Sequence, residues 1–265
     1  MYKNEQLKAN LTGKKDSFSV QAVDRALLLL RLVGESNGPV LIGQLCSRSG
    51  LNRTTAFRLL STLEQNRFVE RNPVTKEYDL GIAAITLCME PQRRYAPLVR
   101  QSVPEMQHLM ELSQETAMLS VPYSSGTLII SQIDPPQSVR LRDYVNRVTA
   151  IHGTSNGKVL ASFYTPAQLD QFLSQSLPAF TECTIIDPAA IRLEIEKVRR
   201  LGYGMVVGEY SIEENAISAP ILYQGAPIGF LGVGGPRLRF TAERMEALAP
   251  DLCSACRRIE ATLNE

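Results

Sequence analysis

Residues 50–68, GLNRTTAFRLLSTLEQNRF, constrain the fold of the N-terminal part more than any other segment. Asn52 is a good helix N-cap, and the run that follows has helical periodicity to about Gln65. The apolar residues fall on one stripe at positions i, i+3, i+4 and i+7: Ala56, Leu59, Leu60 and Leu63. The opposite face is short-chained and hydroxylated, with Arg58 at its middle. Such a helix covers a small core and leaves a polar surface free for contact.

The flanking segments predict two helices before this one and a hairpin after it. Residues 20–32 form a helix whose apolar side carries Val23, Ala26, Leu27 and Leu30. Residues 41–50 form a short helix that lacks a Ser or Thr cap and ends at Gly50. FVER and KEYDL alternate apolar and polar residues as strands do, and NPVT between them supplies turn residues. Three helices followed by a hairpin is the order of a winged helix-turn-helix.

The charge distribution differs between this unit and the remainder of the chain. Residues 1–80 hold 12 Lys and Arg against 8 Asp and Glu, a net charge of +4. The whole chain carries only +1, so the remainder carries −3. A mildly basic winged helix suits a phosphate backbone, although the same pattern also fits a module that binds another protein.

If this unit binds DNA, the polar residues of the third helix and of the hairpin are expected to have different roles. Arg58 has the forked donors that pair with guanine O6 and N7, and short hydroxyl side chains allow close approach to the major groove. Arg53 is better placed for a phosphate or a flanking base, and three hairpin residues are expected to grip the adjacent backbone. The predicted DNA-binding residues are Asn52, Arg53, Thr54, Thr55, Arg58, Ser61, Arg67, Arg71 and Lys76.

The rest of the chain mixes strands and helices. A connecting helix is expected over residues 81–97, disturbed by Pro91, and further helices over about 98–114, 154–163, 166–174, 188–201 and 241–263. Strands are expected at residues 117–123, 126–134, 138–144, 203–210, 216–223 and 226–235. Consecutive hairpin-like strands predict an antiparallel sheet with packed helices, and therefore an α+β fold.

These segments resemble the IclR family of bacterial transcription regulators. The likeness rests on residues 19–33 and 50–81, on AIHGTSNGKVLASF (150–163) and on residues 195–236, and it extends in order over about 18–263. It implies a winged helix-turn-helix DNA-binding domain (18–80), a linker helix (81–97) and a GAF/profilin-like effector-binding domain (98–265); the polar composition of residues 1–17 separately predicts a disordered arm. The resemblance also implies a cytoplasmic, nucleoid-associated repressor or activator that binds double-stranded operator DNA as a homodimer or a dimer of dimers.

The resemblance places a small-molecule effector between the sheet and the helix that begins at GTSNGK. Free N–H groups there favour a carboxylate, although a simple helix cap explains the same residues equally well. The implied effector-binding residues are Gly153, Thr154, Ser155, Asn156, Val206, Glu209, Ala216, Gly232 and Gly234. Glu209 fits the family's acidic position or a structural role.

Four of these positions depart from the polar residues that family members use for small carboxylates: Val206, Ala216, Gly232 and Gly234. Such changes remove hydrogen-bonding partners and add room. A small polar ligand would then leave groups unpaired, which is costly. We therefore expect a bulkier organic acid, aromatic in character, with its carboxylate at residues 154–156.

Other chemistry finds little support in the sequence. No nucleophile–base constellation is evident, and GTSNGKV has the wrong spacing for a phosphate loop, so we expect no enzyme. Cys253 and Cys256 have C-x-x-C spacing but lie in an amphipathic helix without a second ligand pair, so no metal or cofactor is expected. Five scattered cysteines suit a reducing cytoplasm, and the run ALLLLRLV is too short to span a membrane.

Overall fold

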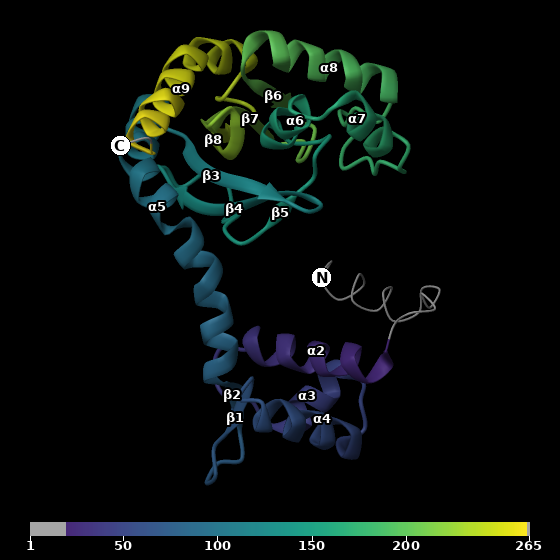
Figure 1. Ribbon diagram of the computed structural model, residues 1–265. Coiled ribbons are helices and arrows are strands. Elements are labelled where there is room, and N and C mark those ends of the chain that lie inside the picture. The colour runs from purple at the N-terminus through teal and green to yellow at the C-terminus, as the bar shows by residue number, and fades with distance from the viewer. Residues whose placement is uncertain (1–19, 264–265) are drawn as a thin grey trace. The chain divides into compact units, whose positions relative to one another are not determined.

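The computed structural model describes residues 20–263, apart from the side chains of residues 88–93. It divides between Arg94 and Tyr95 into two compact units. The predicted arm, residues 1–17, lies outside the described residues. Both units, with their elements labelled, appear in Figure 1.

The N-terminal unit contains three helices and a hairpin. The helices are α2 (Gln21–Gly34), α3 (Ile42–Ser49) and α4 (Arg53–Gln65), and the antiparallel strands are β1 (Val69–Arg71) and β2 (Tyr78–Leu80). Gly50 ends α3 in the left-handed conformation, with φ of 71°. Its backbone N–H donates to the carbonyl of Cys46, as in a common glycine C-cap. The N-cap residue Leu41 has no side-chain cap to offer, and its own N–H donates to the Gln44 side chain at 3.0 Å.

The buried face of α2 is only partly the predicted one: Leu30 packs against the core as predicted, and Ala26 is half-buried. Leu29, Leu32 and Val33 are buried, whereas Val23 and Leu27 are each 53% exposed. The C-terminal half of α2 packs on a small core that includes Leu45, Ala56, Leu60, Val69 and Tyr78. The N-terminal half of α2 therefore presents apolar side chains that the unit does not cover.

The linker region also differs from the prediction. One helix, α5 (Ile82–Ser113), runs through Pro91 where two helices were predicted at about 81–97 and 98–114. A proline removes one hydrogen bond and disfavours the helical conformation of the residue before it. Packing of Leu98, Met106 and Leu109 in the core of the C-terminal unit supports the second half of α5 and outweighs this local preference.

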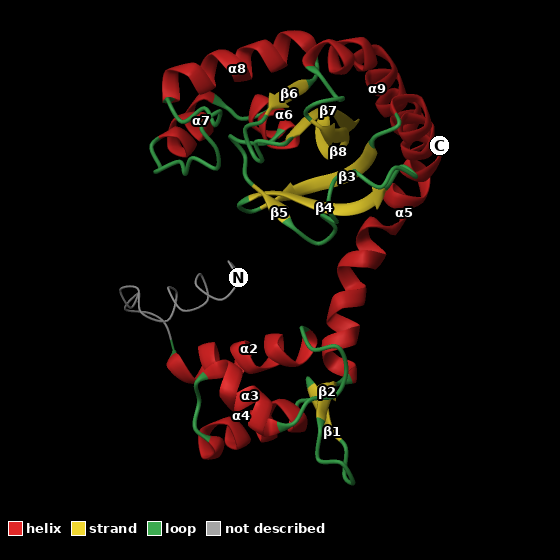
Figure 2. Ribbon diagram, turned by 180° about the vertical axis from the view of Figure 1, so that it is seen from behind, coloured by secondary structure: helices red, strands yellow, loops and turns green. Residues whose placement is uncertain are grey.

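A six-stranded antiparallel sheet forms the C-terminal unit. Its strands are β3 (Thr116–Tyr123), β4 (Gly126–Ile133), β5 (Val148–Thr149), β6 (Gly204–Val207), β7 (Glu214–Tyr223) and β8 (Ala226–Pro236), in the order β5-β4-β3-β8-β7-β6. Part of α5 and α9 (Ala242–Leu263) cover one face. On the other face lie α6 (Ser155–Ser162), then α8 (Pro188–Leu201) and α7 (Pro166–Leu173), as Figure 2 shows from behind.

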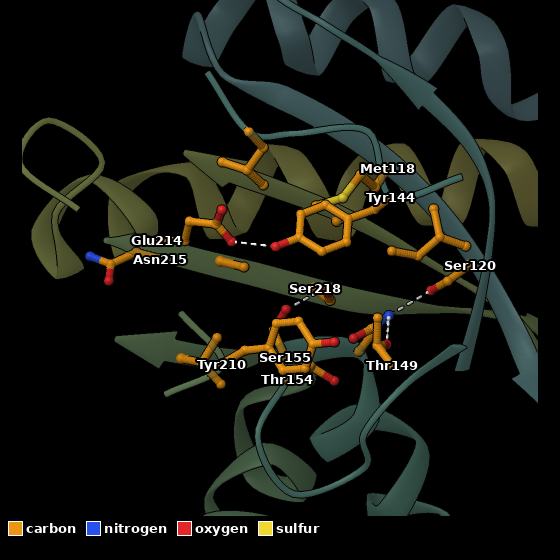
Figure 3. Close-up of a pocket in the computed structure, with 16 residues that line it drawn as sticks. Met118, Ser120, Tyr144, Thr149, Thr154, Ser155, Tyr210, Glu214, Asn215 and Ser218 are labelled. Atoms are coloured by element: carbon orange, nitrogen blue, oxygen red, sulfur yellow. Dashed lines mark hydrogen bonds between the residues drawn. The ribbon is translucent and has the colours of Figure 1, made fainter. Parts of the chain in front are cut away.

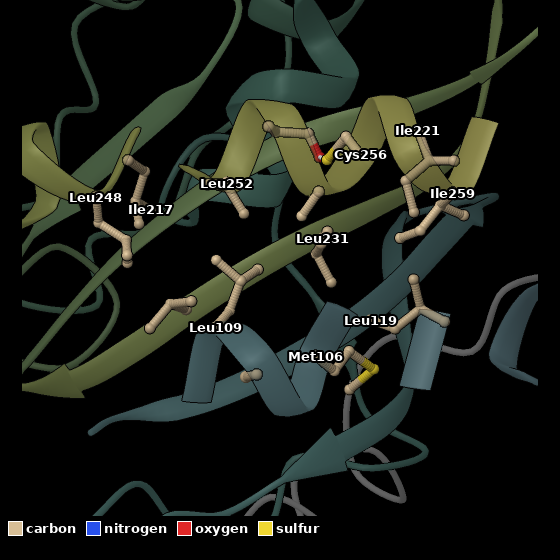
Figure 4. Packing of buried hydrophobic residues seen from close by; sticks show 14 of the residues in the cluster. Met106, Leu109, Leu119, Ile217, Ile221, Leu231, Leu248, Leu252, Cys256 and Ile259 are labelled. Carbon is tan, nitrogen blue, oxygen red and sulfur yellow. Dashed lines mark hydrogen bonds between the residues drawn. The ribbon is translucent and has the colours of Figure 1, made fainter. Parts of the chain in front are cut away.

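Strand alternation separates the two faces of the sheet. Odd-numbered residues of β7 (Ile217, Ala219 and Ile221) pack with Leu119 of β3 and Leu231 of β8 against α5 and α9. Figure 4 shows this core between the helices and the strands. Even-numbered residues of β7 point to the opposite face, since successive strand side chains alternate. That face holds the candidate site.

One predicted strand is absent from the sheet. Residues 138–144 form an irregular loop, and the partner of β4 is the short β5 instead. The Gln132 side chain accepts from the Tyr144 N–H at 3.0 Å and donates to the Arg142 carbonyl at 3.2 Å. These side-chain bonds take the place of ladder hydrogen bonds and turn Leu141 and Tyr144 toward the sheet.

Candidate functional site

The start of α4 is fixed by its cap. The side chain of Asn52 accepts a hydrogen bond from the Thr55 N–H at 2.8 Å, which satisfies one of the free donors of the first turn. Ala56 and Leu60 are fully buried, and Leu59 and Leu63 pack against the same core. The predicted apolar stripe of α4 is thus confirmed.

The opposite face of α4 brings together the predicted polar residues. Arg53, Thr54 and Arg58 are exposed, and Thr55 and Ser61 are half-buried beside them. Phe57, which flanks this face, is 46% exposed. The structure therefore provides one continuous polar surface on α4, and its contact with DNA remains a prediction.

The three predicted hairpin residues differ in exposure, and their contact with DNA stays a prediction. Arg67 and Lys76 are exposed and both have positive φ, 59° and 63°. Arg71 is half-buried, with its guanidinium 5.9 Å from the centroid of the Phe57 ring and 5.6 Å from that of Tyr78. Such cation–π contacts join the hairpin to α4. Arg71 thus holds the wing in place rather than extending freely from it.

A cavity lies on the sheet face opposite α5 and α9. The cavity itself has a volume of about 60 Å³, and it lies within a wider hollow of about 570 Å³ that is partly open to solvent. Its floor comes from the face of the sheet that the main core leaves free. The floor residues are Met118 and Ser120 of β3, Ile129 of β4, Val206 of β6, Glu214, Ala216 and Ser218 of β7, and Gly232 of β8.

The N-terminus of α6 forms a polar wall of this cavity. The Thr154 hydroxyl accepts from the Gly157 N–H at 3.2 Å and caps the helix. The Ser155 hydroxyl is 2.8 Å from that of Ser218, and the Asn156 amide donates to the Ser120 hydroxyl at 3.1 Å. Figure 3 shows these groups around the cavity. The first backbone N–H groups of a helix lack intrahelical partners and favour an anion.

A second polar group lies on the same sheet face, at the start of β7. The Tyr144 hydroxyl donates to the Glu214 carboxylate at 2.6 Å. Burial, and the hydrogen bond that the carboxylate accepts, raise the pKa of Tyr144, so the phenol stays protonated. The Tyr144 ring lies 6.3 Å from that of Tyr210, centroid to centroid, and these two rings from separate loops both line the cavity.

Six of the predicted effector residues line the cavity: Thr154, Ser155, Asn156, Val206, Ala216 and Gly232. Gly153, Glu209 and Gly234 do not. A Cβ at Gly153 would meet the Phe180 ring at 2.9 Å, and one at Gly234 would meet Leu141 at 2.7 Å. Both glycines make room for neighbouring side chains, and Leu141 is itself a lining residue.

Glu209 has a structural environment. Its carboxylate is 2.6 Å from the Nζ of Lys158, and both side chains are buried. Glu194 lies 3.4 Å from the same ammonium group. Burial raises the pKa of Glu209, and the nearby Lys158 opposes this shift. The pair joins α6 to the loop that carries Tyr210.

Sequence reasoning missed several of the polar lining residues. Ser120, Tyr144, Thr149, Tyr210, Glu214 and Ser218 all contribute, so the cavity is not poor in hydrogen-bonding groups. The alternation of β7 contained part of this information, because Glu214 and Ser218 share a face with the predicted Ala216. No comparable signal marks Tyr144 and Tyr210, which lie on loops.

The two cysteines with C-x-x-C spacing, Cys253 and Cys256, are explained by packing in the core. The Cys256 thiol is buried 3.7 Å from the Ala219 carbonyl, and burial raises the pKa of both Cys253 and Cys256. Among residues 20–263, no group of three or more His, Cys, Asp or Glu side chains is arranged to hold a metal ion. No helix in this part of the chain is long and apolar enough to cross a membrane.

Comparisons with known proteins cover both units. The model of the bacterial transcriptional regulator IclR C-terminal domain matches residues 94–261, and that of the IclR helix-turn-helix domain matches residues 22–73. The chain is 29% identical to the HTH-type transcriptional regulator BhcR of Paracoccus denitrificans, over 93% of this chain and 88% of that protein. It is 25% identical to the transcriptional repressor IclR of Escherichia coli, over 91% and 89%.

Solved structures show the same two-domain α+β fold. A putative IclR transcriptional regulator from Silicibacter sp. TM1040 is 28% identical, with a TM-score of 0.68 over 91% of this chain and 95% of that one. An IclR homologue from Microbacterium hydrocarbonoxydans, complexed with 4-hydroxybenzoate, is 21% identical, with a TM-score of 0.75 over 92% and 99%. At this identity the second match speaks for the fold alone.

Proposed function

Since the chain belongs to the IclR family of bacterial transcriptional regulators, we propose that it regulates a catabolic or metabolic operon in response to a small organic or aromatic acid. The observation that carries this proposal is the combination of a polar α4 surface in one unit with a partly open cavity in the other. Regulators of this family bind DNA through the first unit and an effector through the second.

The α4 surface supports operator recognition. Arg58 stands exposed in the middle of a face of short hydroxyl side chains, and Arg53 is exposed in the first turn. Arg58 is suited to read a guanine in the major groove, and Arg53 to contact a phosphate. Arg67 and Lys76 of the wing are exposed and suit contacts with the adjacent backbone.

The cavity supports an acid with an apolar body. Met118, Ile129, Leu141, Val206 and Ala216 supply apolar surface, and the Tyr144 and Tyr210 rings border it. The α6 N-terminus offers the N–H groups that suit a carboxylate. The 4-hydroxybenzoate of the Microbacterium homologue is an acid of this kind, although the argument for this chain rests on its own lining residues.

An uncovered apolar stripe supports a homodimer, alone or paired into a dimer of dimers. Val23 and Leu27 lie on one side of α2 and are each 53% exposed, and Val20, which precedes the helix as its N-cap residue, is 63% exposed. Ile82 and Ile85, at the start of α5 in the same unit, are 59% and 45% exposed. A second copy of this unit would remove both sets from water, which is favourable. An effector would then shift dimer arrangements according to its differential affinity for them.

A gel-shift titration on DNA upstream of the protein's own gene tests the proposal. Arg58→Ala should weaken specific binding by about 1–3 kcal/mol, roughly five- to 150-fold, because it removes a bidentate base contact. Arg31→Ala is the matched control: Arg31 is also exposed in this unit, but it lies on α2 and pairs with Glu35 at 3.7 Å. Circular dichroism checks that both variants keep the fold.

The salt dependence separates DNA contact from the alternative of a protein-binding winged helix. A DNA-binding surface gives affinity that falls steeply with salt, and loss of one phosphate contact in Arg53→Ala should lower the slope by about 1. A flat salt dependence, or equal binding by the Arg58 and Arg31 variants, would contradict operator recognition through α4.

A further inference from the structure

The two ends of the cavity lie along one strand and differ in their hydrogen-bonding chemistry. This arrangement specifies which functional groups the effector carries, beyond the acid that the proposed function requires. Glu214, Ala216 and Ser218 lie on the same face of β7. Glu214 and Ser218 are four residues apart, about 13 Å at the usual strand rise. The Ser218 hydroxyl bonds that of Ser155, the first residue of α6. One end of the cavity is therefore the α6 N-terminus, and the other is Glu214.

The α6 end donates hydrogen bonds. The helix N-terminus carries partial positive charge, and the N–H groups of Ser155 and Asn156 come before that of Lys158, which donates to the Thr154 carbonyl at 2.9 Å as the first intrahelical bond. The Asn156 side-chain amide donates to the hydroxyl groups of Ser120 at 3.1 Å and Thr149 at 3.4 Å, which uses both of its N–H donors and holds these two hydroxyls in the cavity wall. This end is complementary to a carboxylate.

The Glu214 end accepts hydrogen bonds. A carboxylate has about four acceptor positions, and the hydrogen bond from Tyr144 uses one. Among the described residues that line the cavity, Glu214 is the only one with a charged side chain. Two cations lie over the Tyr144 ring, Arg142 at 4.9 Å and Arg147 at 6.0 Å from its centroid, and neither lines the cavity. This end therefore repels a carboxylate and is complementary to a donor.

We infer that the effector is an organic acid with a hydroxyl or amino group at the end opposite its carboxylate, and that Glu214, held by Tyr144, recognises this donor. This inference rests on the proposed function of the cavity. The distance along β7 requires a ring-sized body between the two groups, which excludes acids of two or three carbons. Electrostatic repulsion at Glu214 excludes linear dicarboxylates.

Matched ligands test the inference on the full-length protein by isothermal titration calorimetry. 4-Hydroxybenzoate and 4-aminobenzoate carry the donor, 4-methylbenzoate replaces it with a methyl group of similar size, and terephthalate replaces it with a second carboxylate. The wild type should bind a donor-bearing acid about ten- to 100-fold more tightly than 4-methylbenzoate, because a hydrogen bond to a charged group is lost. Terephthalate should not bind.

Two variants assign the preference to Glu214. Glu214→Met has similar length but no acceptor and should bind the hydroxy and methyl acids equally. Glu214→Gln removes the charge and supplies an amide donor, so terephthalate should gain affinity at least tenfold. Glu213→Gln makes the same change one residue earlier, at an exposed position outside the cavity, and should match the wild type. The gain with Glu214→Gln excludes simple misfolding as the cause.

The outcomes distinguish this inference from the proposed function. Equal binding of the hydroxy and methyl acids by the wild type, tight binding of terephthalate, or an unchanged preference in Glu214→Met overturns the inference and leaves an acid effector standing. Binding of none of these acids to the wild type overturns the proposed effector class together with the inference.

Discussion

Replacing Lys158 with methionine removes the ammonium group that faces the buried carboxylate of Glu209. The two groups are 2.6 Å apart, Lys158 is 1% exposed, and Glu209 is 6% exposed. The second oxygen of Glu209 is buried without a hydrogen-bond partner among the described residues. The variant therefore leaves a desolvated negative charge with Glu194, another carboxylate, nearby.

The expected cost follows from that desolvation. Breaking a buried ion pair by removing one partner costs about 3–5 kcal/mol in the free energy of unfolding. For a unit of this size, that corresponds to a fall of roughly 6–20 °C in melting temperature. The double variant Lys158→Met/Glu209→Met removes both charges and should recover most of the loss, because apolar replacement of buried pairs is often neutral.

The pH dependence provides a second check. Burial raises the pKa of Glu209 in the folded protein, and Lys158 opposes the rise. Without Lys158 the folded-state pKa moves further above the unfolded value, so the native state binds the proton more tightly than the unfolded chain. The free energy of unfolding then falls as pH rises through this window. The cost of Lys158→Met should therefore be smaller at pH 5.5 than at pH 8.

Urea unfolding followed by circular dichroism at both pH values measures these quantities. Lys197→Met is the matched control, because Lys197 is exposed on α8 and its replacement should change the free energy of unfolding by less than about 0.5 kcal/mol. The reasoning fails if Lys158→Met costs no more than Lys197→Met, or if its cost grows on acidification.

Two further predictions concern the N-terminal unit. Asn52→Ala removes the cap bond to Thr55 and should lower the free energy of unfolding by about 0.5–2 kcal/mol, measured by urea unfolding; an unchanged stability would contradict the assigned cap. Leu27→Glu, within the exposed stripe of α2, should dissociate the proposed homodimer in sedimentation experiments, whereas Leu238→Glu, at a 98% exposed site in the other unit, should not. A monomeric wild type would refute this interface.

Local signals in the sequence were sufficient to predict the bounds and the buried side of α4. Asn52 caps α4 and Gly50 ends α3, as predicted. Both features could be predicted because each depends only on residues within one helical turn. The apolar residues of α2 could also be recognised from the sequence, but the sequence did not show which of them are buried. Val23 and Leu27 are as apolar as Leu29, and only the placement of α3, α4 and the hairpin determines which of them the unit covers.

Long-range contacts limited the prediction of the cavity. The loop that carries Leu141 and Tyr144 was predicted as a strand, since nothing in its own residues reveals that the Gln132 side chain holds it away from the ladder. Tyr210 likewise reaches the cavity through a loop fixed by the pairing of Glu209 with Lys158. Residues of this kind are brought together only by the tertiary fold.

The glycines of β8 occupy positions where the resemblance leads one to expect polar residues. They show why the loss of a polar side chain at one position does not by itself predict a less polar ligand. Gly232 and Gly234 remove side chains from the sheet face, which suggests a larger and less polar cavity. A Cβ at Gly232, however, would meet the Ser218 hydroxyl at 2.5 Å, and one at Gly234 would meet Leu141 at 2.7 Å. The vacated space is filled by a hydroxyl from β7 and an apolar side chain from a loop. Loss of polar groups from β8 is therefore compensated on β7, where Ser218 and Glu214 bring hydrogen-bonding groups to the cavity.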